Sequence, residues 1–303
     1  MAAEKNGFIL VSVLLATTLL VTSATAFAWF ARTEGQREAR RELIKSCRNA
    51  AEVAVSVLGQ KIAADKNKYD SRTEPLYAPG QHTEFDLGNY KISAKITPLN
   101  DRIALEGLFL PDGVTVRSEY EYAWNSIWEA LEHPELAAQT VDFMDKDKKQ
   151  KLGGTEREGN INRLVSDLSE LRGIPELDDG ILYGTKEKPG GLALYVTALG
   201  GQKLNINVAA PEVVARLDSQ LTLSHANSIK AYSLLNPIKS LDDLKKVPGF
   251  PPTLATKLGN IIGFESELFR LEMQVTDSLG RTRNYRVTLK RNGKDCSVVK
   301  WEE

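Results

Sequence analysis

The segment Phe8–Ala31, FILVSVLLATTLLVTSATAFAWFA, determines how the rest of this chain must be arranged. It has 24 residues and contains neither a charged side chain nor a proline. As an α-helix it would be roughly 36 Å long, enough to cross a hydrocarbon core of about 30 Å. A short segment, MAAEKNG, precedes it. We therefore expect residues 8–31 to span a membrane once and the large remainder to lie on one side of it.

A cleaved secretory signal is the alternative for this segment. Ala24-Thr25-Ala26 has the small residues at which signal peptides are cut. However, the apolar run continues through Phe27, Trp29 and Phe30, and a helical pattern follows directly. This continuity favours a helix that is retained whole, with any cleavage falling before it.

Length and composition limit what the soluble part can do. A chain of 303 residues is long enough for a membrane helix and two compact domains. Its net charge of -1 gives no overall field for holding nucleic acid. The histidines (His82, His133 and His225) are scattered without metal-ligand spacing, and no phosphate loop or nucleophile motif accompanies them. We therefore expect a structural protein and not an enzyme.

Helical and strand patterns follow the membrane segment. An apolar stripe at three- and four-residue spacing extends the first helix to about Asp65: Ile44, Cys47, Ala51, Ala54, Leu58 and Ile62. Alternation then predicts strands over Tyr90–Thr97, Phe269–Thr276 and Tyr285–Leu289. A further strand is expected over Arg102–Leu110, after a turn at Asn100-Asp101. These elements predict an α+β domain in which the long helix packs on one face of an antiparallel sheet.

Helical patterns occupy the chain between the two groups of strands. The candidates are Glu119–Glu132, Pro211–Asp218, Leu221–Leu235, Ser240–Val247 and Pro252–Ile262. A short strand is expected over Leu192–Leu199, between two Gly-Gly turns. The sequence therefore predicts an all-α domain, residues 118–263, inserted between strands of one sheet. Its ends should lie close together.

The order of these features resembles the GspK family, the type IV pilin-like minor pseudopilins of type II secretion systems. The leader ends in Gly7, and Ser12 stands where most pilins have Glu at the fifth residue after the cut. Val141–Asp147 followed by Gly153–Glu156 is similar to the acidic D-x-x-D-x-D…G-x-E loop of that family. Leu204–Val214 is similar to its I-N-V-N-T-A-x-x-E-V-L segment, with Val208 in place of the usual Thr.

The resemblance implies a domain plan. It comprises a prepilin leader (1–7), the transmembrane part of the helix (8–31), the periplasmic helix with the first strands (32–117), the insert (118–263) and the C-terminal strands (264–303). It also implies that a prepilin peptidase cuts between Gly7 and Phe8 and that Phe8 is methylated. The protein would then be a single-pass inner-membrane subunit with a periplasmic body. Its expected partners are GspI-like and GspJ-like minor pseudopilins and the major pseudopilin, with no nucleic acid. The bulky insert and the missing Glu indicate a subunit that caps the tip.

The acidic loop is the candidate metal site. Asp145, Asp147 and Glu156 stand at relative positions one, three and twelve, as in an EF-hand loop. Lys149 and Gln150 occupy positions that an EF-hand needs for a ligand and for glycine, so the loop is not an EF-hand. The resemblance implies calcium, held by Asp142, Asp145, Asp147 and Glu156. The alternative is a solvated acidic turn neutralised by the neighbouring lysines: Lys146, Lys148, Lys149 and Lys151.

Three further hypotheses remain open. Cys47 and Cys296 could form a disulfide in an oxidising periplasm, or remain a buried thiol and a loose one. Two segments ending in Gly173-Ile174-Pro175 and Gly249-Phe250-Pro251 resemble helix-hairpin-helix turns. They raise the alternative of a DNA-binding minor pilin, although each has Pro, which lacks an N–H, where a second Gly would face phosphate. A secreted calcium-dependent enzyme is the third hypothesis.

Overall fold

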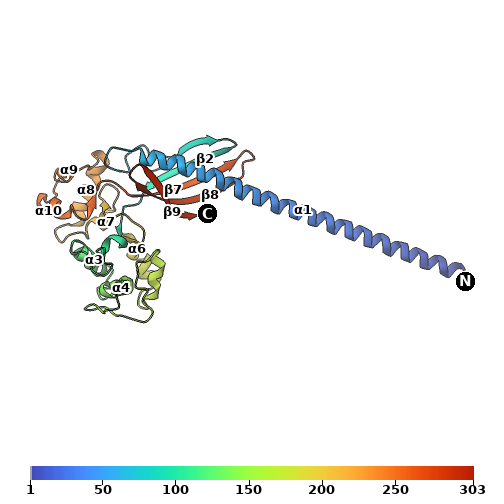
Figure 1. Cartoon of the computed structure of the whole chain (residues 1–303), viewed down its shortest axis with the longest axis horizontal. Coiled ribbons are helices and arrows are strands. Elements are labelled where there is room, and N and C mark those ends of the chain that lie inside the picture. Colours follow the sequence, from blue (N-terminus) through green and yellow to red (C-terminus); the bar gives the residue numbers. More distant parts are fainter. Residues whose placement is uncertain (1) are drawn as a thin grey trace.

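The computed structural model describes residues 2–303, with side chains from Ile9 onward, so the predicted cleavage site at Gly7 and Phe8 lies outside the residues with described side chains. Helix α1 (Ala2–Ala63) is one continuous helix. Its N-terminal half projects far from the body, and its C-terminal part lies along the sheet (Figure 1). Within the described residues, α1 is the one helix long and apolar enough to cross a membrane, with no part of its apolar window buried in the protein. The predicted span therefore coincides with the projecting part of α1.

The five-stranded antiparallel sheet has the order β1-β2-β7-β8-β9. Its strands are β1 (Thr83–Leu87), β2 (Tyr90–Pro98), β7 (Leu268–Asp277), β8 (Thr282–Asn292) and β9 (Asp295–Glu302). The alternation seen in the sequence sets the register, since Ile92 pairs with Val275 and Leu271 pairs with Val287. These apolar side chains form one face, which packs against α1. The predicted pilin-like α+β fold is confirmed.

The contact between α1 and the sheet depends on small residues. Ala51 and Ala54 are fully buried on the helix stripe, beside Cys47, Leu58 and Ile62. Small side chains let a helix approach the sheet closely, and the larger Leu and Ile fill the space between strands. Because this stripe continues the apolar N-terminal half of α1 without a break, the sheet fixes the direction in which that half projects.

The insert between β2 and β7 is mainly helical and has its own core. Its helices are α2 (Leu105–Leu108), α3 (Ser118–Ala130), α4 (Leu136–Met144), η1 (Leu168–Gly173), α5 (Asp179–Tyr183), α6 (Gly191–Tyr195), α7 (Pro211–Val214), α8 (Leu223–Leu235), α9 (Leu241–Leu244) and α10 (Pro252–Leu258). Two pairs of two-residue parallel strands cross-link it: β3 (Ile103–Ala104) with β4 (Val196–Thr197), and β5 (Leu204–Asn205) with β6 (Ile262–Gly263). The insert thus contains short strands as well as the expected helices, and it lies at the end of the body away from the projecting half of α1 (Figure 1).

Two strand predictions within the insert are wrong. Most of Arg102–Leu110 forms β3 and the short helix α2, and Leu192–Leu199 is mainly the end of α6 followed by β4. Leu105 and Leu108 are both fully buried in the helical core. Packing of these two leucines on one helical turn favours a helix over the expected strand.

The ends of the insert meet, but at Leu99 and Leu268, outside the predicted bounds of 118 and 263, because Ile103, Leu105 and Leu108 already belong to the helical core. The Leu99 N–H donates to the carbonyl of Leu268 (2.8 Å), so the chain leaves and re-enters the sheet at one place. The Asn100 side chain accepts hydrogen bonds from the N–H groups of Glu267 (3.0 Å) and Leu268 (3.1 Å). Asn100 is buried and holds both crossings together.

Of the two possibilities for the cysteines, the structure shows the free thiols and not the disulfide. Cys47 lies on α1 and is fully buried against the sheet, whereas Cys296 lies against Gly59: a Cβ built on that glycine would be 3.2 Å from the Cys296 Cβ. Cys47 and Gly59 are separated by about 18 Å along the helix axis. A disulfide requires Cα atoms within about 7 Å, so the two thiols cannot pair.

Candidate cation-binding site

The acidic loop begins where helix α4 ends. Asp142 lies in the last turn of α4, and Asp145 is the residue that follows the helix, with its N–H bonded to the Val141 carbonyl. Both aspartates are completely buried. A buried carboxylate is costly unless it is hydrogen-bonded or paired with a cation, so these two side chains require compensation from the loop that follows.

The loop supplies part of that compensation by folding back over α4. The N–H of Lys151 donates to both carboxylate oxygens of Asp142 at 3.1 Å, and the Lys151 ammonium contacts Asp145 Oδ2. Gly154 is packed so tightly that an added Cβ would lie 2.1 Å from Asp142 Oδ2. The glycine is therefore required by the close approach of the loop to the carboxylate.

A second segment closes the site from the other side. The Asn160 amide donates to the carbonyls of Asp142 and Thr155, each at 3.2 Å, and the Asn162 amide donates to Glu156 Oε1 at 3.4 Å. Asn162 has a left-handed backbone (φ 47°), a conformation that asparagine tolerates better than most residues. These contacts bring Glu156 to the same region as the end of α4.

Several buried oxygens at this site have no hydrogen-bond donor among the described residues. They are Asp145 Oδ1, Glu156 Oε2 and Asn162 Oδ1. Carboxylate and amide oxygens are the ligands that Ca²⁺ and Mg²⁺ take in proteins, and an unpaired buried oxygen is otherwise unfavourable. The donor set therefore suits a hard divalent cation.

The pKa shifts of Asp142 and Asp145 show that the acidic residues of the loop interact. Burial raises the pKa of Asp142 and the pKa of Asp145, although Lys151 favours the ionised form of each. Glu156 and Asp147 add repulsion at Asp142, and Asp147 adds it at Asp145, so the four predicted residues act on one another. Their oxygens do not form a group within 4.8 Å of one another, and Asp147 Oδ1 accepts a hydrogen bond from the N–H of Lys149. The structure thus brings the four predicted residues to one region.

Asn160 and Asn162 are the site residues that the sequence did not reveal. Lys151 is expected only as one of four neutralising lysines, yet it alone of the four forms an ion pair with a buried carboxylate of the site. Lys148 and Lys149 are exposed. Of the four lysines expected to neutralise the acidic turn, Lys151 is therefore the one that forms an ion pair with a buried aspartate of the site.

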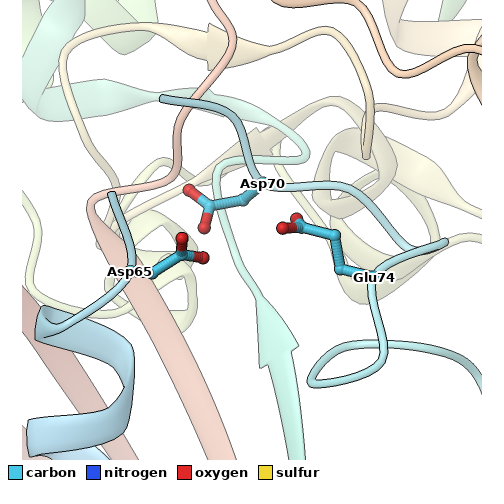
Figure 2. A group of neighbouring side chains, drawn as sticks. All are labelled: Asp65, Asp70 and Glu74. Carbon is cyan, nitrogen blue, oxygen red and sulfur yellow. The ribbon is translucent and has the colours of Figure 1, made fainter. Parts of the chain in front are cut away.

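A second acidic group was not predicted (Figure 2). Oxygens of Asp65, Asp70 and Glu74 lie within 4.8 Å of one another, and within residues 9–303 no other group of three such ligands is this compact. Asp70 is paired with Arg291, and Glu74 accepts from the Ser71 N–H at 2.7 Å. Internal partners thus account for Asp70 and Glu74, and we interpret the group as structural.

The remaining candidate residues have structural roles. His225 is hydrogen-bonded to Thr222 at the start of α8, and His133 lies 3.2 Å from Glu135. In the first hairpin-like turn, an added Cβ on Gly173 would meet the ring of Phe143 at 2.6 Å. That turn therefore packs against Phe143 of α4, although Gly173 itself is exposed.

The fold defines a structural class: a pilin-like arrangement of a long N-terminal helix, an antiparallel sheet and a large helical insert. Among solved structures, the chain matches one chain of the crystal structure of the GspK–GspI–GspJ complex from the type 2 secretion system of enterotoxigenic Escherichia coli. The TM-score is 0.62 with 18% sequence identity, over 89% of this chain and 98% of that one. The likeness therefore shows that the whole arrangement, insert included, is the GspK-like pilin fold. No family model and no curated protein matches this sequence.

Proposed function

We propose that this protein is a structural, non-catalytic subunit of a type II secretion pseudopilus, a minor pseudopilin that acts in protein export across the outer membrane. The observation that carries the proposal is the division of α1. Its first half is apolar and exposed, while its second half is built into the core of the soluble body. Such a helix can pack beside equivalent helices of other subunits while the membrane or the filament covers its apolar surface.

The proposed partners follow from the structural likeness. The solved complex joins GspK with GspI and GspJ, so we propose GspI-like and GspJ-like subunits as neighbours and a major pseudopilin below them. The body would lie in the periplasm, anchored by a single span in the inner membrane.

We also propose that the subunit caps the tip. The insert lies beyond the sheet at the end opposite the N-terminus (Figure 1), where it would obstruct a further subunit stacked above. Ser12, on the exposed part of α1, replaces the carboxylate that most pilins carry. A carboxylate in lipid needs a partner, and a subunit at the tip has no subunit above it to contact.

The first test is the identity of the mature N-terminus. We expect the full chain, recovered from membranes of cells with a prepilin peptidase, to begin with methylated Phe8 and to retain its apolar helix. A Gly7→Val variant is the matched control and should keep its leader. A soluble chain beginning at Phe27 would contradict the proposal and support a secreted protein.

The second test locates the subunit on assembled filaments. A tag on the full chain, detected by immunogold labelling, should be found at filament ends. Labelling along the shaft would contradict tip capping while leaving a pseudopilin role intact. The DNA-binding alternative is tested separately: salt-dependent binding of duplex DNA to the full chain would support it.

We further propose that Asp142, Asp145 and Glu156, with the Asn162 side-chain oxygen, hold calcium, and that Asp147 adds charge at the edge of the site. The support is the set of buried oxygens without donors. The cation would link the end of α4 to the segment around Asn162, so its role would be to stabilise the insert.

A further inference from the structure

Lys151 contacts both fully buried carboxylates of the acidic loop. Its N–H donates to Asp142, and its ammonium contacts Asp145 Oδ2. The Lys151 side chain is 31% exposed while that of Asp145 is 0% exposed. The lysine thus reaches from the surface into the region where the divalent cation would bind.

The other lysines of the loop do not share this position. Lys148 and Lys149 are exposed, and the stem of Lys146 lies over Gly113. Among the described residues, Lys151 is the one cationic side chain in ion-pair contact with Asp142 or Asp145. Lys151 therefore compensates the buried charge of Asp145 through its position, and the other lysines of the loop do not.

The Lys151 ammonium at Asp145 Oδ2 and a divalent cation at the unpaired Asp145 Oδ1 would share one carboxylate. Two positive charges this close in a partly buried site repel each other, so each weakens the binding of the other. The Lys151 side chain is long, flexible and partly exposed, so it can move into solvent without unfolding the loop. Its N–H can remain bonded to Asp142 during that movement.

We infer that Lys151 is an internal counter-cation that competes with the divalent cation for Asp145 and thereby sets the affinity of the site. This inference rests on the proposed calcium site. When the cation binds, the ammonium leaves Asp145; when the cation is lost, the ammonium returns and the buried carboxylate stays paired. The loop is therefore held against α4 in both conditions, and calcium binding is weaker than the carboxylate ligands alone would give.

The test compares Lys151→Met with Lys149→Met in the full chain in detergent micelles. Both variants remove one positive charge from the loop, but only the first removes a contact with a buried carboxylate. We expect Lys151→Met to raise calcium affinity by roughly tenfold or more, measured by competition with a chelator of known affinity. Lys149→Met should change it by about threefold or less, because an exposed charge is screened. Lys151→Arg, which keeps the charge, should resemble the wild type.

Thermal unfolding in EDTA is the second readout. Without calcium, Lys151→Met should unfold at a lower temperature than Lys149→Met, because Asp145 is left buried and unpaired, and added calcium should remove the difference. Purification in calcium keeps the measurement possible if the metal-free variant is unstable.

The outcomes separate the two hypotheses. If neither the wild type nor any variant binds calcium, the cation site itself is wrong and the competition falls with it. If the wild type binds calcium but the two methionine variants have equal affinities, the site stands and the role of Lys151 is wrong. A lower affinity in Lys151→Met would also overturn the inference.

Discussion

Arg291 on strand β8 holds Asp70, 221 positions earlier in the sequence, through two hydrogen bonds of 2.6 and 3.3 Å. The same guanidinium donates to the Ser266 carbonyl (2.8 Å), and the Ser266 N–H donates to Asp70 (2.5 Å). The Asp70 side chain is completely buried and that of Arg291 nearly so. This ion pair therefore ties the loop after α1 to the point at which the insert rejoins the sheet.

Arg291→Met should destabilise the protein by about 3–5 kcal/mol, because it leaves the Asp70 carboxylate buried without its partner. The free energy of unfolding can be measured by denaturant titration followed by tryptophan fluorescence. The matched control is Arg286→Met on the same strand, whose ion pair with Glu272 is exposed (3.7 Å) and should contribute about 1 kcal/mol or less. Equal losses in the two variants would show that the Asp70 pair has no special role.

The loss caused by Arg291→Met should depend on pH. Burial already raises the pKa of Asp70 above its ordinary value of 3.8, against the effects of Arg291 and the Ser266 N–H. Removing Arg291 should raise that pKa further. A raised folded-state pKa gives stability that is present below the unfolded pKa and is lost as pH rises through the folded value. The difference between Arg291→Met and the wild type should therefore be smallest near pH 4 and increase toward pH 7. A loss independent of pH would contradict this account.

Asp145→Asn should abolish or strongly weaken calcium stabilisation. For the wild type, calcium at about 100 times its dissociation constant should add about 2.7 kcal/mol to the free energy of unfolding. Thermal unfolding with and without calcium measures the effect. Glu158→Gln, which changes an exposed carboxylate nearby, is the control and should keep the full calcium response.

Gly154→Ala should weaken calcium binding and lower stability, because its Cβ would collide with the Asp142 carboxylate. Gly159→Ala is the matched control, since nothing lies within 4 Å of a Cβ at that position. Calorimetric titration with calcium distinguishes the two variants. Normal binding by Gly154→Ala would mean that the loop does not approach Asp142 so closely.

Thiol labelling should distinguish the cysteines. Cys47 is fully buried and Cys296 is partly exposed, and burial raises the pKa of each thiol. We expect a maleimide to label Cys296 slowly in the native protein and both thiols after unfolding without reductant, as counted by mass spectrometry. Labelling of neither thiol after unfolding would show that a disulfide forms after all.

Much of the sheet domain was predictable because its signals are local. The alternation in Tyr90–Thr97 and Phe269–Thr276 identifies the buried face, and the stripe on α1 identifies the surface that covers it. Leu105 and Leu108 were not predictable as helical, since their burial depends on a core assembled from distant segments. In the cation site, the residue types of Asp142 and Asp145 suggested a metal. Their complete burial, and the selection of Lys151 among four similar lysines, depend on how the loop folds back.

The hydrogen bond between Leu99 and Leu268 has an architectural consequence. The chain leaves the sheet and returns to it at neighbouring residues of the paired strands β2 and β7. A tight hairpin could therefore replace the whole insert without altering the strand order or the packing of α1 on the sheet. The packing of α1 on the sheet is thus independent of the size of the insert, and a smaller, larger or different insert could occupy the same position.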